Sequence, residues 1–193
     1  AALVPATAAT LAAGDLIKAS GPAVYYYAAD GQRYTFPTES TFMSWYDNFD
    51  TVKTITDDEL AAIDLACNVV VRSGTNLVKI STVPKVYAVE PNGTLVWLKT
   101  AAAAEALYGA DWESNLIIIP DGFWTNYTDA GAELDGTAYP DGQLVKLAAG
   151  ADTYYVNADG TWSKVATEAA FTANMWSWDD VVTAPASMTM TAG

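Results

Sequence analysis

Apolar and polar positions recur along this chain in one order three times. Each recurrence opens with two apolar residues and a lysine, continues with a run of tyrosine and valine, and passes an Asp-Gly or Asn-Gly pair. It ends in a segment rich in alanine and aromatic residues. The opening lysines are Lys18, Lys79 and Lys146, so one unit spans roughly 60 to 70 residues. A self-similar unit of this length indicates a repeated supersecondary module.

Each unit predicts a β-hairpin. The Tyr/Val-rich runs have high β propensity, and the opening triplets read as short strands that precede them. The pairs Asp30-Gly31, Asn92-Gly93 and Asp159-Gly160 predict tight type I′ turns, in which both central residues have positive φ. On the strand after each turn, this pattern aligns Trp97 of the second unit with Trp162 of the third.

A helix is expected after each hairpin. Thr38, Thr100 and Thr167 stand where an N-cap hydroxyl would accept from free amides. The residues that follow carry apolar side chains at helical spacing, which predicts a core-facing stripe. Its members are Phe42, Trp45, Tyr46 and Phe49 in the first unit, and Phe171, Met175 and Trp178 in the third.

The segments between the units also carry local signals. Thr56 and Glu59 form a capping box, which predicts a short helix. A strand is expected over 68–72, and a loop rich in glycine, aspartate and alanine over 129–142. The single cysteine, Cys67, lies in an apolar stretch, so we expect a buried free thiol.

The fold class predicted is α+β and β-rich, with three diverged β-hairpin-plus-helix modules and a mainly antiparallel sheet. The expected boundaries are an N-terminal tail 1–14, module 1 at 15–74, module 2 at 75–140, a truncated module 3 at 141–183, and a C-terminal tail 184–193. Few residues follow Val182, so module 3 is expected to lack the connecting elements that come after the first two helices.

Both tails are uncharged and carry apolar residues. These are Leu3, Val4 and Leu11 in the N-terminal tail, and Met188 and Met190 in the C-terminal tail. Alternating apolar residues suit β-strand addition to a neighbour, in which the backbone supplies hydrogen bonds and every second side chain fills a pocket. The alternative is that both tails are frayed ends.

Charge and composition exclude several functions. Acidic residues outnumber basic ones 23 to 9, giving a net charge of −14 that repels phosphate backbones and anionic lipid. Apolar runs are too short to span a bilayer. The chain has no histidine, which removes Ser-His triads and histidine zinc sites, and it has no phosphate loop. A carboxylate-pair glycosidase stays open as the alternative, because 23 acidic residues permit many pairs and the sequence alone does not set their separation. No recognisable catalytic constellation is present, so we expect no enzymatic activity. We also expect no nucleic-acid partner and no membrane insertion.

Calcium is the one metal that the sequence suggests, and no other cofactor is expected. Asp135, Asp141, Asn157 and Asp159 lie in glycine-containing turns, and oxygen ligands suit hard cations. The alternative is that these residues only form the turns. Asn92 and Asn126 begin N-glycosylation sequons.

Three segments carry a resemblance to known proteins: 15–18, 74–79 and 84–89 resemble repeats of large secreted surface and S-layer-type bacterial proteins. The resemblance covers 15–182, implies a cell-envelope or extracellular setting, and brings no known catalytic residues. Separately, residues 154–162 are similar to the aromatic hairpins of choline- and glucan-binding repeats.

Taken with the tails, these observations predict a structural subunit of an extracellular filament or surface layer, which assembles head-to-tail by terminal strand exchange with copies of itself. The alternative is a cell-wall carbohydrate-binding module with wall glycan as its partner. The small residue Ala1 at the start fits processing by signal peptidase during export.

Overall fold

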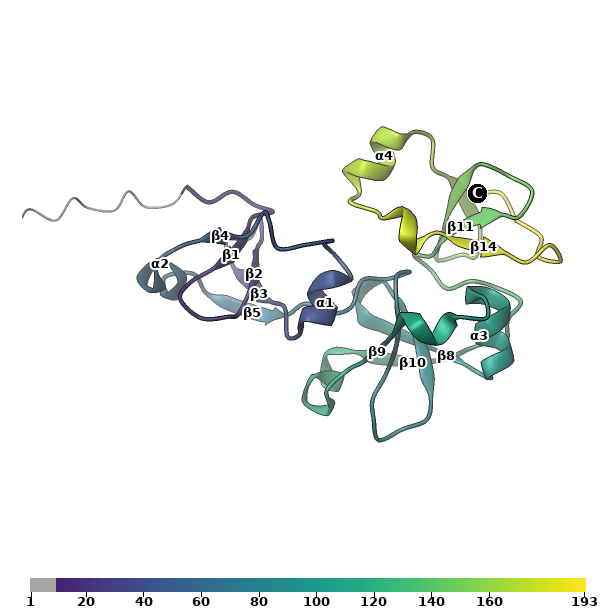
Figure 1. Cartoon of the computed structure of the whole chain (residues 1–193), viewed down its shortest axis with the longest axis horizontal. Coiled ribbons are helices and arrows are strands. Elements are labelled where there is room, and N and C mark those ends of the chain that lie inside the picture. Colours follow the sequence, from purple (N-terminus) through teal and green to yellow (C-terminus); the bar gives the residue numbers. More distant parts are fainter. Residues whose placement is uncertain (1–9) are drawn as a thin grey trace, which may run out of the picture. The chain divides into compact units, whose positions relative to one another are not determined.

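The computed structural model describes residues 10–193 and contains three β-sheets (Figure 1). The fold is α+β, and antiparallel hairpins form the centre of each sheet, as predicted. The chain divides into two compact units at the Val69–Val70 peptide. The first sheet belongs to one unit, and the second and third sheets belong to the other.

The first sheet has the strand order β4-β1-β2-β3-β5. Its strands are β1 (Leu16–Lys18), β2 (Tyr25–Tyr27), β3 (Arg33–Thr35), β4 (Lys53–Thr54) and β5 (Leu65–Asn68), with the helices α1 (Glu39–Met43) and α2 (Asp57–Ala61) between them. Strands β1, β2 and β3 are antiparallel, whereas β4 and β5 lie parallel to the hairpin strands that they flank.

The second sheet repeats this order as β9-β6-β7-β8-β10. Its elements are β6 (Leu77–Lys79), β7 (Val86–Glu90), β8 (Thr94–Leu98), α3 (Ala101–Tyr108), β9 (Leu116–Ile118) and β10 (Thr128–Leu134). Short 3-10 turns cover Pro91–Gly93, Trp112–Asn115 and Asp121–Asn126. Here again the outer strands β9 and β10 are parallel to their neighbours.

The third sheet contains four named strands in the order β14-β11-β12-β13. Its elements are β11 (Leu144–Leu147), β12 (Thr153–Val156), β13 (Trp162–Lys164), α4 (Glu168–Ala173), a 3-10 turn (Trp178–Asp180) and β14 (Val182–Ala184). Strand β14 is parallel to β11, as β4 is to β1 and β9 is to β6. In residues 10–193, no named strand covers the outer side of β13.

The three opening lysines occupy equivalent places, as predicted. Each lies on the opening strand of its sheet and pairs in parallel with the strand that follows the module's helix. The pairs are Lys18 with Thr54, Lys79 with Ile118, and Lys146 with Thr183.

A glycine precedes each opening strand and fixes the alignment of the modules. Gly14, Gly74 and Gly142 all have positive φ. The N–H of each donates to a backbone carbonyl near the end of the second strand of its module, at 2.8, 3.1 and 3.0 Å. The acceptors are Tyr27, Val89 and Val156, and their partners across the hairpin are Arg33, Leu95 and Trp162. The predicted alignment of Trp162 with Trp97 is therefore wrong, because Trp162 occupies the place of Leu95.

The hairpin turns follow the prediction only in module 2. Asn92 and Gly93 have φ of 62° and 73°, as a type I′ turn requires. In the Asp-Gly pairs of modules 1 and 3, only the glycine, Gly31 or Gly160, has positive φ. The aspartate before each glycine instead accepts a backbone N–H two residues later, which favours a turn that ends on a left-handed glycine.

All four predicted helix N-caps are present. The hydroxyls of Thr38, Thr56, Thr100 and Thr167 each accept an N–H three residues later, and Thr56 and Glu59 form the expected capping box. These contacts begin helices that are shorter than the aromatic spacing predicted.

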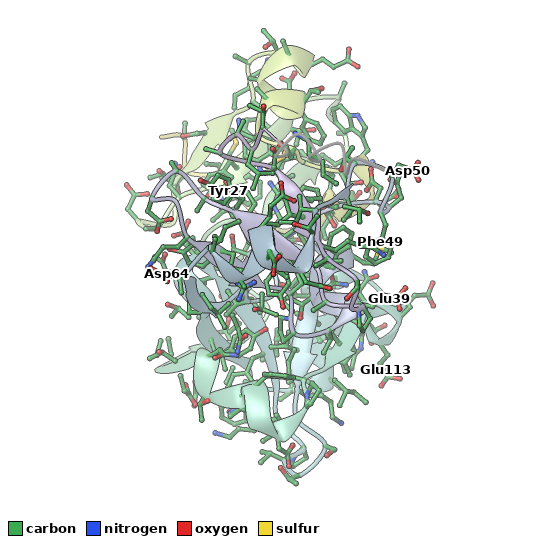
Figure 2. The ribbon with its side chains drawn as sticks, turned by 90° about the vertical axis from the view of Figure 1, so that its left-hand side faces the viewer. Tyr27, Glu39, Phe49, Asp50, Asp64 and Glu113 are labelled. Carbon is green, nitrogen blue, oxygen red and sulfur yellow. The ribbon has the colours of Figure 1, made fainter. Side chains whose placement is uncertain are left out.

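The predicted aromatic stripes are wrong beyond the first turn or two. Helix α1 ends at Met43, so Phe49, which is labelled in Figure 2, lies in the loop that follows. Its ring stacks on that of Phe42 with centroids 4.2 Å apart. In module 3, Trp178 stacks in the same way on Phe171, at 3.9 Å. Met175 has φ of 54° and is 53% exposed, so it does not face the core.

Cys67 corrects another expectation, because its thiol is exposed. It lies on β5, whose first three residues face solvent at the edge of the first sheet. The strand expected over 68–72 is therefore displaced toward the N-terminus. Likewise, the segment 129–142 is not wholly a loop, since it contains most of β10.

Modules 2 and 3 share one apolar cluster. It joins side chains of the second sheet and α3, such as Leu98 and Leu107, to side chains of the third sheet, such as Val145 and Trp162. A second cluster covers the other face of the second sheet, and a third lies within module 1. The third sheet therefore packs against the second through apolar side chains.

Candidate assembly site

The outer side of the third hairpin strand distinguishes module 3 from the other two. In modules 1 and 2 this side is covered by a parallel strand, β5 or β10, which we call the closing strand. The closing strands pair with equivalent residues, Arg33 with Leu65 in module 1 and Leu95 with Asp129 in module 2. In module 3 the equivalent Trp162 makes one isolated parallel bridge with Ala192.

This bridge has the geometry of the first residue of a closing strand. The N–H of Trp162 donates to the carbonyl of Thr191 at 2.8 Å, and the N–H of Gly193 donates back to the carbonyl of Trp162 at 3.2 Å. In module 1 the equivalent Arg33 N–H donates to the carbonyl of Asp64 at 2.9 Å. The C-terminal residues thus enter the position in the same direction and register.

The next pairing position on this edge is Lys164. Its equivalents Thr35 and Trp97 pair with Asn68 and Glu133 of the closing strands. The backbone N–H and C=O groups of successive residues in a strand point to alternate sides. The carbonyl of Thr161 accepts from Asn157 and the N–H of Val165 donates to Thr153, so both residues bond toward the β12 side. The backbone groups of Lys164 therefore face the outer edge, where residues 10–193 provide no second bridge. We call this edge, Trp162–Lys164, the closing-strand site.

Apolar side chains lie beneath the closing-strand site. The Trp162 ring is 5% exposed and lies about 6 Å from the rings of Tyr139 and Tyr154. Met188 and Met190, which the sequence predicted for assembly, are half-buried and pack against the same cluster. In this structure they pack within their own chain. Leu11 is half-buried, whereas Leu3 and Val4 lie outside the described residues.

Polar side chains beside the site bond to one another. Asp159 accepts from the Thr161 hydroxyl at 2.7 Å and from its N–H, and these bonds lower the pKa of Asp159. The Asn157 amide donates to the hydroxyls of Thr161 and Ser163, both at 2.9 Å. The Lys164 ammonium pairs with Asp152 at 2.8 Å, which raises the pKa of the lysine. The edge is therefore held in shape by local contacts.

The four residues proposed for calcium mostly have protein partners. Asn157 and Asp159 share Thr161, and Asp135 accepts from the hydroxyl and N–H of Thr137. Asp141 donates its N–H to Glu90, and burial raises the pKa of both carboxyl groups. In the described part of the chain, no three acidic or cysteine side chains come together as a metal site would need. Calcium binding by these turns stays a prediction.

The two sequons differ in access. Asn92 is exposed on the β7–β8 turn. The side-chain nitrogen of Asn126, which would carry a glycan, is buried and makes no hydrogen bond. Only Asn92 presents its amide for modification in the folded protein.

Module 2 also contains a cavity of about 310 Å³ beside the first turn of α3. Trp97, Trp112, Lys85 and Lys99 contribute to its wall. The Lys85 ammonium lies 4.3 Å from the centroid of the Trp97 indole, and Lys99 pairs with Glu133 at 3.2 Å. Aromatic faces together with cations form a surface on which a polar, ring-shaped ligand can lie.

Sequence reasoning missed the residues that define the closing-strand site. Trp162 was aligned two positions out of place, and Ala192 and the module glycines were not singled out. The signal was nevertheless present, because Gly14, Gly74 and Gly142 precede the three apolar pairs at short distances. Aligning on these glycines places Trp162 with Arg33 and Leu95.

No family model, curated protein or solved structure matches this chain. Within residues 10–193, the helices are all too short or too polar to pass through a bilayer.

Proposed function

We propose that this chain is the structural subunit of an extracellular filament or surface layer, and that copies join head-to-tail by strand exchange at the closing-strand site. The observation that carries the proposal is the single Trp162–Ala192 bridge, where modules 1 and 2 have a full closing strand. A sheet edge of this kind is a template for a strand from another chain, because its backbone groups are already aligned.

The contact would be head-to-tail, because one surface accepts a strand and a different part of the chain donates it. The acceptor is in module 3, and the proposed donors are the segments 1–14 and 184–193. Contacts between two different surfaces propagate as filaments or lattices unless the rotation between copies closes a ring. The proposal needs no catalytic group, nucleic acid or membrane anchor.

Backbone hydrogen bonding gives the sharpest test. Lys164→Pro removes the N–H that faces the outer edge and leaves the inner bonds to β12 in place. Lys164→Ala keeps that N–H and, like the proline variant, loses the ion pair with Asp152. We expect Lys164→Pro to remain monomeric in sedimentation velocity and negative-stain microscopy, while Lys164→Ala assembles as the wild type does. A wild-type chain that stays monomeric at high concentration, or a Lys164→Pro variant that assembles normally while folded by circular dichroism, overturns the proposal.

The second candidate is binding of wall carbohydrate, and the module 2 cavity favours it. Trp97 and Trp112 offer aromatic surface for a sugar ring, and Lys85 supplies a cation. A glycan array with the wild type and Trp112→Ala would separate the two functions. Binding that Trp112→Ala abolishes, in a protein that does not assemble, favours the carbohydrate function over the filament.

A further inference from the structure

The cavity in module 2 lies at a place where modules 1 and 3 carry a phenylalanine ring. Helices α1, α3 and α4 each begin after a threonine N-cap, and the fourth residue after that threonine is buried. This residue is Phe42 in module 1 and Phe171 in module 3, but it is Ala104 in module 2, where it contributes to the cavity wall. The volume of about 310 Å³ is therefore space that a side chain fills in the other two modules. It lies at the lower end of the range for small-molecule sites, roughly 300 to 1,000 Å³.

In modules 1 and 3 this phenylalanine forms an aromatic stack with a residue that follows the helix. The stacked pairs are Phe42 with Phe49, at a centroid distance of 4.2 Å, and Phe171 with Trp178, at 3.9 Å. In module 2 the segment after the helix supplies Trp112, which is half-buried and lines the cavity together with Ala104. The cavity thus keeps one member of an aromatic stack, and a ring-shaped ligand can take the place of the other.

Three more residues that line the cavity differ from their equivalents in the other modules. The hairpin register places Trp97 where module 1 has Thr35 and module 3 has Lys164, since each pairs with an equivalent tyrosine of the second strand. The same register, continued one or two residues outward, gives Ala23 and Asp152 as the equivalents of Lys85, and Pro37 and Ala166 as the equivalents of Lys99. Module 2 alone therefore combines a small helix residue with an indole and two lysines at this corner.

The two lysines give the cavity a charge opposite to that of the chain as a whole. Acidic residues outnumber basic ones 23 to 9, so most of the surface repels anions. Lys85 and Lys99 are both exposed, and the lining residues within 10–193 include no carboxylate. Lys99 pairs with Glu133 at 3.2 Å, while the Lys85 ammonium lies 4.3 Å from the centroid of the Trp97 indole. Two cations beside one acidic neighbour leave a net positive charge, which favours an anionic ligand.

We propose that this cavity binds a sugar ring that carries a carboxylate, as a uronic acid does. The C–H face of the ring lies against the indoles of Trp97 and Trp112, in the space that a phenylalanine takes elsewhere. The carboxylate lies toward Lys85 and Lys99. The Thr100 hydroxyl accepts the N–H of Ala103 and still has its own proton to donate to a ring hydroxyl, which favours a sugar over an aromatic acid.

This inference rests on the carbohydrate function given above as the second candidate and names its ligand class. It is independent of strand exchange, because the cavity and the closing-strand site share no residue. The protein would hold acidic polysaccharide through module 2 whether or not copies of it assemble.

Two matched sugars test the ligand class on the full chain. Methyl β-glucuronide and methyl β-glucoside share one ring and differ only in the group at C6, a carboxylate or a hydroxymethyl. Titrated into ¹⁵N-labelled protein, the glucuronide should shift the indole N–H signals of Trp97 and Trp112 and bind roughly tenfold more tightly or better than the glucoside. Equal affinities would mean that the carbohydrate function stands and the acidic class is wrong. Binding of neither sugar would overturn both.

Lysine variants test the source of the preference. Lys85→Gln combined with Lys99→Gln should reduce the affinity for the glucuronide to that for the glucoside. The matched control is Lys53→Gln combined with Lys164→Gln, which removes the same charge from two exposed lysines outside the cavity and should leave the preference intact. Loss of the preference in the control alone, or in both double variants equally, would assign it to net charge and contradict the site.

Ala104→Phe tests the place of the ring. The variant restores the side chain of modules 1 and 3, so we expect it to fold, to unfold at no lower urea concentration than the wild type, and to bind the glucuronide roughly tenfold more weakly or worse. Ala102→Phe makes the same change at an exposed position of α3 and should bind as the wild type does. A folded Ala104→Phe variant that binds normally contradicts the inference. A variant that fails to fold does so too, because the cavity would then have no room for a ring.

Discussion

Trp162 and Ala192 pair in parallel at the outer edge of the third sheet, in the register that Leu95 and Asp129 hold in the second. One residue of a closing strand is thus present where the other modules have several. Because the backbone direction and first hydrogen bonds are already correct, completing the strand requires further residues and no rearrangement of β13. This relationship defines the site on which the assembly proposals depend.

The junction between modules 2 and 3 depends on two facing glycines. A Cβ on Gly74 would overlap the carbonyl group of Gly142, and its φ of 71° is unfavourable for other residues. We expect Gly74→Ala to lower the free energy of unfolding by about 3 kcal/mol or more, combining overpacking with the cost of left-handed backbone. Chemical denaturation of the purified variant measures it.

Gly160→Ala is the matched control, because Gly160 has φ of 78° and open space around its Cβ position. It should cost only the left-handed backbone, roughly 1 to 2 kcal/mol. Equal losses in the two variants would mean that the close approach of Gly74 to Gly142 does not contribute.

Gln143 makes a buried polar contact across the same junction. Its side chain is 1% exposed, and Nε2 donates to the carbonyl of Gly74 at 2.9 Å. Gln143→Met keeps the size but removes the donor, so we expect a loss of about 1 to 3 kcal/mol in urea denaturation. The same change at the half-buried Gln32 should stay within about 0.5 kcal/mol. A loss at Gln32 as large as that at Gln143 would contradict the role of this hydrogen bond.

The fold could be predicted from the sequence where local chemistry decides it. The threonine caps and the hairpin strands follow from side chains that act on their own neighbourhood, and Asn92-Gly93 takes the predicted turn. The repeat then places Lys18, Lys79 and Lys146 correctly, since equivalent local elements pack alike.

The closing strands could not be predicted in the same way. Strand β10 carries glycine, alanine and acidic residues and is exposed over most of its length, so it has neither alternation nor an apolar run. It is a strand because β8 offers a sheet edge beside it. The site at β13 is likewise a matter of long-range pairing, and it becomes visible only after the modules are aligned on backbone hydrogen bonds.

The exposed position of Cys67 predicts its reactivity. Because the thiol lies on the solvent side of β5, we expect it to react with a maleimide in the native protein at a rate within a few-fold of that in denaturant. Mass spectrometry after a short pulse of reagent measures the modified fraction. Labelling that occurs only after unfolding would show that Cys67 is covered in solution, for example by another copy, and repeating the pulse at high dilution would distinguish that case from burial within the chain.

Glu90 and Asp141 predict how stability depends on pH. Burial raises the pKa of Glu90, and the nearby charge of Asp141 raises it further, while burial also raises the pKa of Asp141. A carboxyl group whose pKa is higher in the folded state favours folding while it is protonated. That contribution is complete below the unfolded pKa of about 4 and is lost as the pH rises through the folded value.

Glu90→Gln should remove this loss, since the amide is neutral at every pH and its oxygen can still accept the N–H of Asp141. We expect the variant to unfold at a higher urea concentration than the wild type at pH 7, and at nearly the same concentration at pH 3.5. Carboxylates with the opposite shift, such as Asp15, whose pKa its bond with Lys53 lowers, lose their contribution as the pH falls. They do so equally in both proteins, so they cancel in the difference.

Glu113→Gln, at an exposed glutamate, is the control and should shift neither midpoint. A gain from Glu90→Gln that is the same at both pH values would show that the buried charge of Glu90 is not its cause.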